Sequence, residues 1–142
     1  MKSACWILAL ASVAISGCGS SGGSEEKLTP AEDRLVNIGQ AYANARNNLG
    51  RPPKNLEEIR SYFEASPDDV TRSPNDGEEF VILWGTDSNV PPQLQSSGIV
   101  AAYEKNGTGG KRNVLLFPLR VIAMTDEELA KCSFAQGYKP PQ

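Results

Sequence analysis

Acidic side chains crowd one short, turn-rich segment, residues 66–79, and four of them are candidate ligands because carboxylate oxygens are the ligands that calcium prefers in proteins. The four are Asp68, Asp69, Asp76 and Glu78. Their spacing differs from that of an EF-hand loop, and helix caps and turns use the same residue types. The segment therefore predicts a candidate calcium site, with local capping and turn formation as the alternative explanation.

The chain contains no histidine, which narrows the chemistry further. Ser-His-Asp and Cys-His nucleophiles need an imidazole base, and histidine is the commonest metal ligand. No other nucleophile–base pair is evident, so we expect a protein that is not an enzyme and needs no cofactor. Cys132 lies close to Phe134, and we predict that it is a small buried apolar residue rather than a reactive thiol.

Length and charge describe an ordinary globular protein. The 142 residues are 39% hydrophobic and 22% charged, with a net charge of −3. This length suits one domain, and the acidic balance without a basic stripe argues against a nucleic-acid partner.

Residues 1–17 have the order of a secretory signal peptide. Lys2 supplies a short positive region, and Ala4–Ile15 form an apolar stretch that is too short for a permanent membrane helix. The stretch ends in ISGC, Ile15–Cys18, which resembles the lipobox of bacterial lipoproteins. The resemblance implies that Cys18 is lipidated and becomes the mature N-terminus. The alternative is an ordinary cleaved signal peptide followed by an incidental cysteine.

Residues 18–28 follow as the lipidated cysteine and a flexible Gly/Ser tether. The nine residues 19–27 would span roughly 15–18 Å as a flexible coil. The lipobox resemblance implies an envelope protein that is held to a membrane by its lipid, since several acyl chains anchor firmly. By the same resemblance, Gly19 in place of an aspartate after the cysteine favours the periplasmic face of the outer membrane.

A single domain over residues 29–138 is predicted to begin with two helices, and residues 139–142 form a tail. Thr29, Pro30 and Glu32 give the first helix an N-cap, a proline at its first position and a capping box. Its apolar stripe consists of Leu35, Ile38, Tyr42, Ala45 and Leu49. Gly50 is a natural C-terminal stop, and a shorter helix is expected over residues 55–65.

Strand signals dominate the second half of the domain. Residues 79–85 read as a central strand, and residues 99–105, 111–117 and 120–124 as three further strands. The sequence NGTGG, residues 106–110, predicts a hairpin between two of them. A terminal helix is expected over residues 125–132, where Thr125 and Glu128 repeat the capping box. Helices followed by hairpin-linked strands predict an α+β fold with an antiparallel sheet.

The segment that joins the first helix to the second resembles the corresponding part of type IV pilin heads and type II secretion pseudopilins. The residues that carry the resemblance are Tyr42, Gly50, Pro53, Leu56 and Ile59. It implies a long N-terminal helix packed on a three- to four-stranded antiparallel sheet. The sequences SPNDGEEFVILWG, AAYEKNG and MTDEELAK are also similar to predicted lipoproteins of planctomycete-type bacteria. Because a lipobox and a tether replace the apolar pilin helix, we expect no pilin-like polymer.

Two function classes remain after these exclusions. The first is a non-catalytic interaction module, anchored to the membrane, whose partner is an envelope or secretion-system protein. Trp84 and Tyr103 are the candidate contact residues, with a place in the core as the alternative. The second class is a calcium- or small-ligand-binding lipoprotein.

Overall fold

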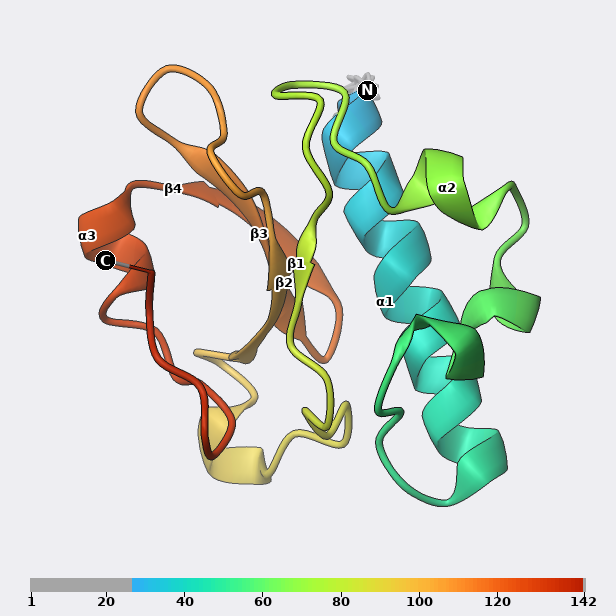
Figure 1. The fold of residues 1–142 in the computed structure, drawn as a ribbon. Coiled ribbons are helices and arrows are strands. Elements are labelled where there is room, and N and C mark those ends of the chain that lie inside the picture. Colours follow the sequence, from blue (N-terminus) through green and yellow to red (C-terminus); the bar gives the residue numbers. More distant parts are fainter. Residues whose placement is uncertain (1–26, 142) are drawn as a thin grey trace, which may run out of the picture.

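The computed structural model describes residues 27–141 and has an α+β architecture (Figure 1). A long helix, α1 (Pro30–Leu49), packs on a four-stranded antiparallel sheet with the strand order β1-β2-β3-β4. The predicted α+β class, with a long N-terminal helix packed on a three- to four-stranded antiparallel sheet, is therefore confirmed. The predicted signal peptide, the lipidated Cys18 and most of the tether lie outside the described residues. None of the helices within residues 27–141 combines the length and apolar character that a membrane span requires.

Helix α1 begins and ends where its sequence predicts. The backbone N–H of Glu32 donates to Thr29 Oγ1 over 3.4 Å, and the Thr29 N–H donates to Glu32 Oε2 over 2.7 Å. This capping box satisfies two backbone donors that the helix itself leaves free. Gly50 closes the helix in the left-handed conformation, with φ +68°, as expected of a residue without a Cβ.

The buried face of α1 rests directly on the centre of the sheet. Leu35, Ile38 and Tyr42 pack with Leu115 and other apolar side chains of the strands. At Gly39, an added Cβ would lie 2.6 Å from Leu119 Cδ1 and 3.2 Å from Leu115 Cδ2. The glycine therefore allows the helix backbone to approach β3 closely.

The four strands are β1 (Val81–Ile82), β2 (Ile99–Tyr103), β3 (Arg112–Phe117) and β4 (Arg120–Met124). The prediction of a central strand over residues 79–85 is wrong, because β1 has two residues and lies at an edge. The segment is apolar throughout because both of its faces are covered. Phe80, Ile82 and Trp84 join the cluster under α1, whereas Val81 and Leu83 join a cluster on the other face.

The second face of the sheet is closed by the C-terminal part of the domain, on the side opposite α1 (Figure 1). Leu129, Phe134 and Tyr138 pack there against strand residues such as Val100 and Leu116. The Val100 N–H donates to Ser133 O over 2.9 Å, so this segment is also tied to β2 through the backbone. The domain thus has three layers, with the sheet in the middle.

Helix α3 (Asp126–Leu129) is one turn long, shorter than the predicted residues 125–132. Its predicted capping box is present, since the Thr125 hydroxyl and the Glu128 carboxylate each accept from the other's backbone N–H. The helix ends early because the chain turns at once to bring Ser133 beside Ile99 of β2. Two short helices were not predicted: α2 (Pro67–Val70) and the 3-10 turn η3 (Pro92–Leu94).

Residues 55–65 form two 3-10 turns, η1 (Leu56–Glu58) and η2 (Arg60–Tyr62), in place of the predicted helix. Asn55 caps the first turn as expected, with its side chain accepting from the Glu58 N–H over 3.1 Å. Ile59, between the two turns, is fully buried against Ala41 and Ala45 of α1. Leu56, Tyr62 and Phe63 are partly buried around it, and the three-residue spacing of Leu56, Ile59 and Tyr62 suits the three residues per turn of a 3-10 helix.

Glu58 is predicted to make stability fall in acid. Its carboxylate accepts hydrogen bonds from the Arg51 guanidinium, over 2.9 and 3.0 Å, and from the Lys54 N–H, over 2.9 Å. These bonds lower the pKa of Glu58 to about 2, against about 4.3 for a glutamate in an unfolded chain. The stabilisation is therefore present above pH 4.3 and is lost as the pH falls toward 2.

We expect the urea midpoint of the wild type to drop between pH 5 and pH 2 by more than that of Glu58→Gln. Glu64→Gln is the control, because Glu64 is exposed and has no ion pair within residues 27–141. Identical pH curves for Glu58→Gln and the wild type would contradict the assignment.

Candidate functional site

The four carboxylates of the predicted calcium site do not gather around one point. Asp68 and Asp69 lie exposed in the first turn of α2, whereas Asp76 and Glu78 reach the hairpin between β2 and β3. Within residues 27–141, no three acidic or cysteine side chains are placed to share a metal ion. The structure therefore separates these residues into a helix turn and a hairpin contact.

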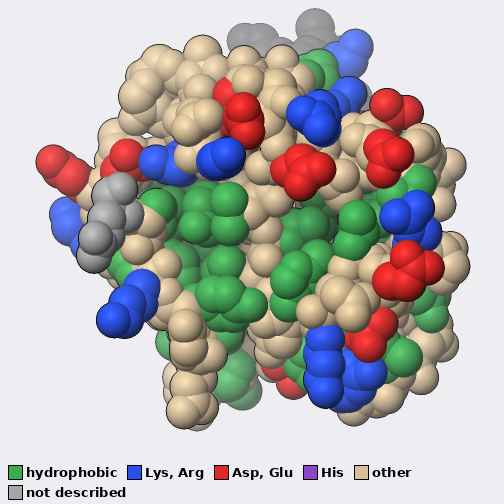
Figure 2. All heavy atoms as spheres, viewed as in Figure 1, with side chains coloured by type: hydrophobic (Ala, Val, Ile, Leu, Met, Phe, Trp, Pro, Cys, Tyr) green, Lys and Arg blue, Asp and Glu red, His purple; other side chains and the backbone are tan. Residues whose placement is uncertain are grey.

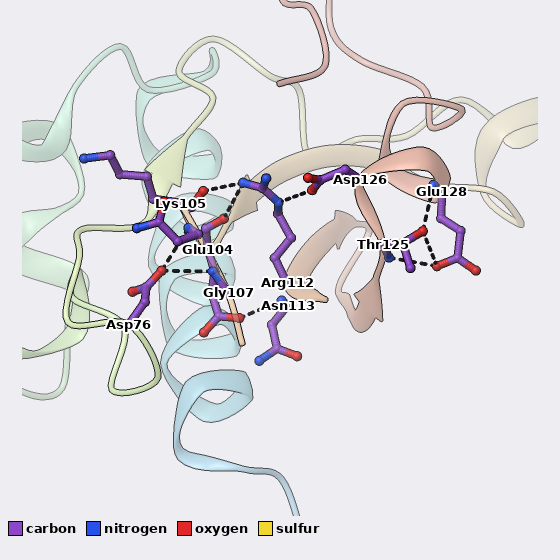
Figure 3. Close-up of polar contacts among 10 residues, drawn as sticks. Asp76, Glu104, Lys105, Gly107, Arg112, Asn113, Thr125, Asp126 and Glu128 are labelled. Carbon is purple, nitrogen blue, oxygen red and sulfur yellow. Dashed lines mark hydrogen bonds and ion pairs between the residues drawn. The ribbon is translucent and has the colours of Figure 1, made fainter. Parts of the chain in front are cut away.

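Asp76 holds the hairpin through backbone donors (Figure 3). Its Oδ2 accepts from the N–H groups of Asn106 and Gly107 over 2.9 and 3.0 Å, and its Oδ1 accepts from the Glu78 N–H over 2.9 Å. Partial burial raises the pKa of Asp76, but these N–H donors outweigh it and leave the pKa below its usual value. The capping alternative thus accounts for this carboxylate.

Glu104 is a buried carboxylate that the sequence analysis did not single out. Its side chain is 1% exposed. Oε1 accepts from Ser73 Oγ over 2.6 Å and from Asn75 Nδ2 over 2.8 Å, and Oε2 accepts from the Asn113 N–H over 2.7 Å. The sequence does contain a sign of this role, because Glu104 is a charged residue at an inward position after an apolar strand. The residues that donate to Glu104 are distant from it in the sequence, so the sequence alone does not identify them.

Arg112 links the hairpin to the C-terminal helix (Figure 3). Its Nε donates to Asp126 over 2.6 Å, and its Nη1 donates to the backbone oxygens of Glu104 and Lys105. The hydrogen bond from Arg112 lowers the pKa of Asp126 below its usual range. The charged groups in this region therefore bind one another and the backbone, and their arrangement serves the fold.

Trp84 and Tyr103, the two predicted contact residues, lie on opposite faces of the sheet. Tyr103 is 8% exposed and belongs to the cluster that the C-terminal segment covers. Trp84 follows β1 on the α1 side, where its ring stacks on Tyr42 at a centroid distance of 6.0 Å. The two residues do not form one aromatic surface, and only Trp84 remains partly accessible.

Cys132 lies half-buried on the second face of the sheet, close to Met124. Burial raises the pKa of its thiol, which keeps it in the less nucleophilic protonated form. The predicted packing role agrees with this environment, although the residue is less buried than expected.

A cavity of about 240 Å³ lies beside the edge strand, and we call it the β1 cavity. Its apolar lining consists of Leu56, Phe80, Ile82 and Trp84. Its polar lining consists of Asp68, Thr71 and Glu79. The cavity joins Trp84 and Asp68, two residues that the sequence analysis had assigned to different functions.

Comparison with known proteins gives no assignment. The chain matches no protein-family model, and neither curated proteins nor solved structures gave a match.

Proposed function

We propose that this chain is a membrane-anchored envelope lipoprotein whose folded domain is a non-catalytic protein-interaction module. In this proposal a lipid on Cys18 holds the protein at the periplasmic face of the outer membrane. Residues 19–28 tether the domain, whose pilin-head-like fold binds an envelope or secretion-system protein. The domain does not polymerise.

The order of features at the N-terminus carries the proposal. The chain begins with an apolar stretch, continues with ISGC at Ile15–Cys18 and a Gly/Ser segment, and then enters the folded domain at Thr29, the N-cap residue of α1. A tether of this composition gives a domain freedom to reach a neighbour without leaving the membrane surface. Asp76, Glu104 and Arg112 take part in hydrogen bonds that stabilise the hairpin, so their presence is accounted for without a catalytic role.

The calcium alternative is not proposed, because no observation favours it. Asp76 already accepts three backbone N–H groups, and Glu78 pairs with Lys105 Nζ over 3.0 Å.

Cys18→Ser is expected to move the protein from the washed membrane fraction to the soluble periplasmic fraction. The substitution removes the thiol that accepts the lipid, and the apolar stretch of residues 4–15 is too short to hold the chain in a membrane by itself. The measurement is immunodetection in cell fractions together with incorporation of radiolabelled palmitate. Cys132→Ser is the matched control and should keep both the label and the membrane location. Full membrane retention of unlabelled, processed Cys18→Ser protein would overturn the anchoring proposal.

A further inference from the structure

The β1 cavity lies on the face of the domain that contains β1, the 3-10 turn η1 and the start of α2. Hydrophobic side chains gather in the middle of this face, with charged side chains around them (Figure 2). The volume of about 240 Å³ is below the roughly 300–1,000 Å³ of most small-molecule sites. A single inserted side chain suits this size better than a cofactor.

The backbone of β1 leaves one position of its outer edge open to this cavity. Leu83 N–H donates to Ala101 O over 2.8 Å, toward β2. Backbone groups alternate in direction along an antiparallel strand. The N–H and C=O groups of Phe80 and Ile82 therefore point to the outer edge of β1, away from β2. The Phe80 N–H is already used by Thr71 O, over 2.8 Å. Ile82, which lines the cavity, therefore presents its N–H and C=O at the edge beside it.

The charge around the cavity is acidic. Asp68 and Glu79 contribute carboxylates to the lining, and none of the lysines and arginines within residues 27–141 does. Within residues 27–141, Asp68 has no ion pair, and Glu79 has one long pair of 4.0 Å to an exposed Arg72, which screens it little.

We propose that the β1 cavity binds an extended segment of a partner protein through one lysine or arginine side chain. The aliphatic stem of that side chain packs on Phe80 and Trp84, its cationic end pairs with Asp68 and Glu79, and the segment's backbone pairs with Ile82. A long cationic side chain fits this combination because its stem is apolar and only its end is charged. The indole ring of Trp84 adds a favourable surface for the cation. This inference rests on the proposed interaction role and names the chemistry of the partner.

The test uses the full lipidated chain in detergent micelles and two peptides that carry the same fluorophore at the N-terminus, Thr-Val-Lys-Val-Thr-amide and its counterpart with norleucine for lysine. Norleucine keeps the stem and removes the charge. We expect the lysine peptide to bind at least tenfold more tightly by fluorescence anisotropy. The double variant Asp68→Asn/Glu79→Gln should remove this preference, because it keeps the lining's shape and removes both carboxylates.

The control is Asp33→Asn/Glu127→Gln, which removes the same charge from two exposed positions in α1 and α3. It should bind the lysine peptide as the wild type does. Equal binding of both peptides, or an equal loss of affinity in both double variants, would overturn the proposed site. The assay measures peptide binding in micelles, whereas the Cys18→Ser experiment measures the membrane location in cells. Failure of the peptide to bind would therefore contradict the β1 cavity proposal and leave the lipid-anchor proposal unaffected.

Discussion

Replacing Glu104 with alanine is expected to lower the free energy of unfolding by about 3 kcal/mol or more. The carboxylate is 1% exposed and accepts three hydrogen bonds, from Ser73, Asn75 and Asn113. Alanine leaves the Ser73 hydroxyl and the Asn113 N–H, which belong to buried residues, without their acceptor, whereas Asn75 is exposed and can turn to water. Each buried donor that loses a charged acceptor costs on the order of 1–3 kcal/mol.

The measurement is urea unfolding followed by far-ultraviolet circular dichroism, with Glu127→Ala as the control. Glu127 is exposed in α3, and its side chain has no hydrogen bond within residues 27–141. We expect the control to change stability by less than about 0.5 kcal/mol. Glu104→Gln should lie between the two, because its amide oxygen keeps one acceptor while its NH₂ faces a donor. Equal stability of Glu104→Ala and Glu127→Ala would show that the buried hydrogen bonds contribute nothing.

Gly107→Ala is the second substitution with a large expected effect, again about 3 kcal/mol or more. Gly107 has φ +71°, and a Cβ there would lie 2.1 Å from Lys111 O and 2.8 Å from the Arg112 Cα. The clash is with backbone atoms, so no side-chain rotation relieves it. The hairpin would have to open, and Asp76 would then lose its contact with the Gly107 N–H.

Gly109→Ala separates the clash from the backbone conformation. Gly109 lies in the same hairpin with φ +64°, but no atom of residues 27–141 lies within 4 Å of an added Cβ. Alanine there bears only the cost of the left-handed conformation, about 1–2 kcal/mol. The difference between the two variants in thermal or urea unfolding therefore measures the close approach at Gly107. Indistinguishable losses would mean that the hairpin relaxes without cost.

Features set by neighbouring residues were predictable from the sequence. The capping boxes at Thr29 and Thr125, the stop at Gly50 and the hairpin at residues 106–110 each depend on contacts within a few positions of the chain. All the residues that form each of these features lie within a few positions of one another, so the sequence alone is enough to predict them.

Features set by distant residues were not predictable in the same way. The segment around β1 reads as a central strand because it is apolar on both faces, and only the packed layers show that it lies at an edge. The donors that bind Glu104 are 9 to 31 positions away in the sequence. The acidic residues near Asp68 and Asp76 look like one group in the sequence, yet the chain folds them toward a cavity and a hairpin.

The candidate site shows the same division. Trp84 was identified as a candidate contact from its residue type alone. Its neighbours in the cavity, Leu56 and Asp68, come from segments that the chain brings to the edge strand only after folding. Residue type can therefore suggest that a side chain takes part in binding, whereas the composition of the lining depends on the tertiary structure.

The closing of the second sheet face by residues 129–138 has a consequence for the order in which the domain matures. These residues follow all four strands along the chain, so they leave a ribosome or a translocation channel after the sheet is available. Until then the side chains of Val100, Val114 and Leu116, which lie on the sheet face opposite α1, have no covering layer. The nascent sheet would therefore expose an apolar face for as long as synthesis of the last segment takes, and a holding chaperone has a defined surface to protect.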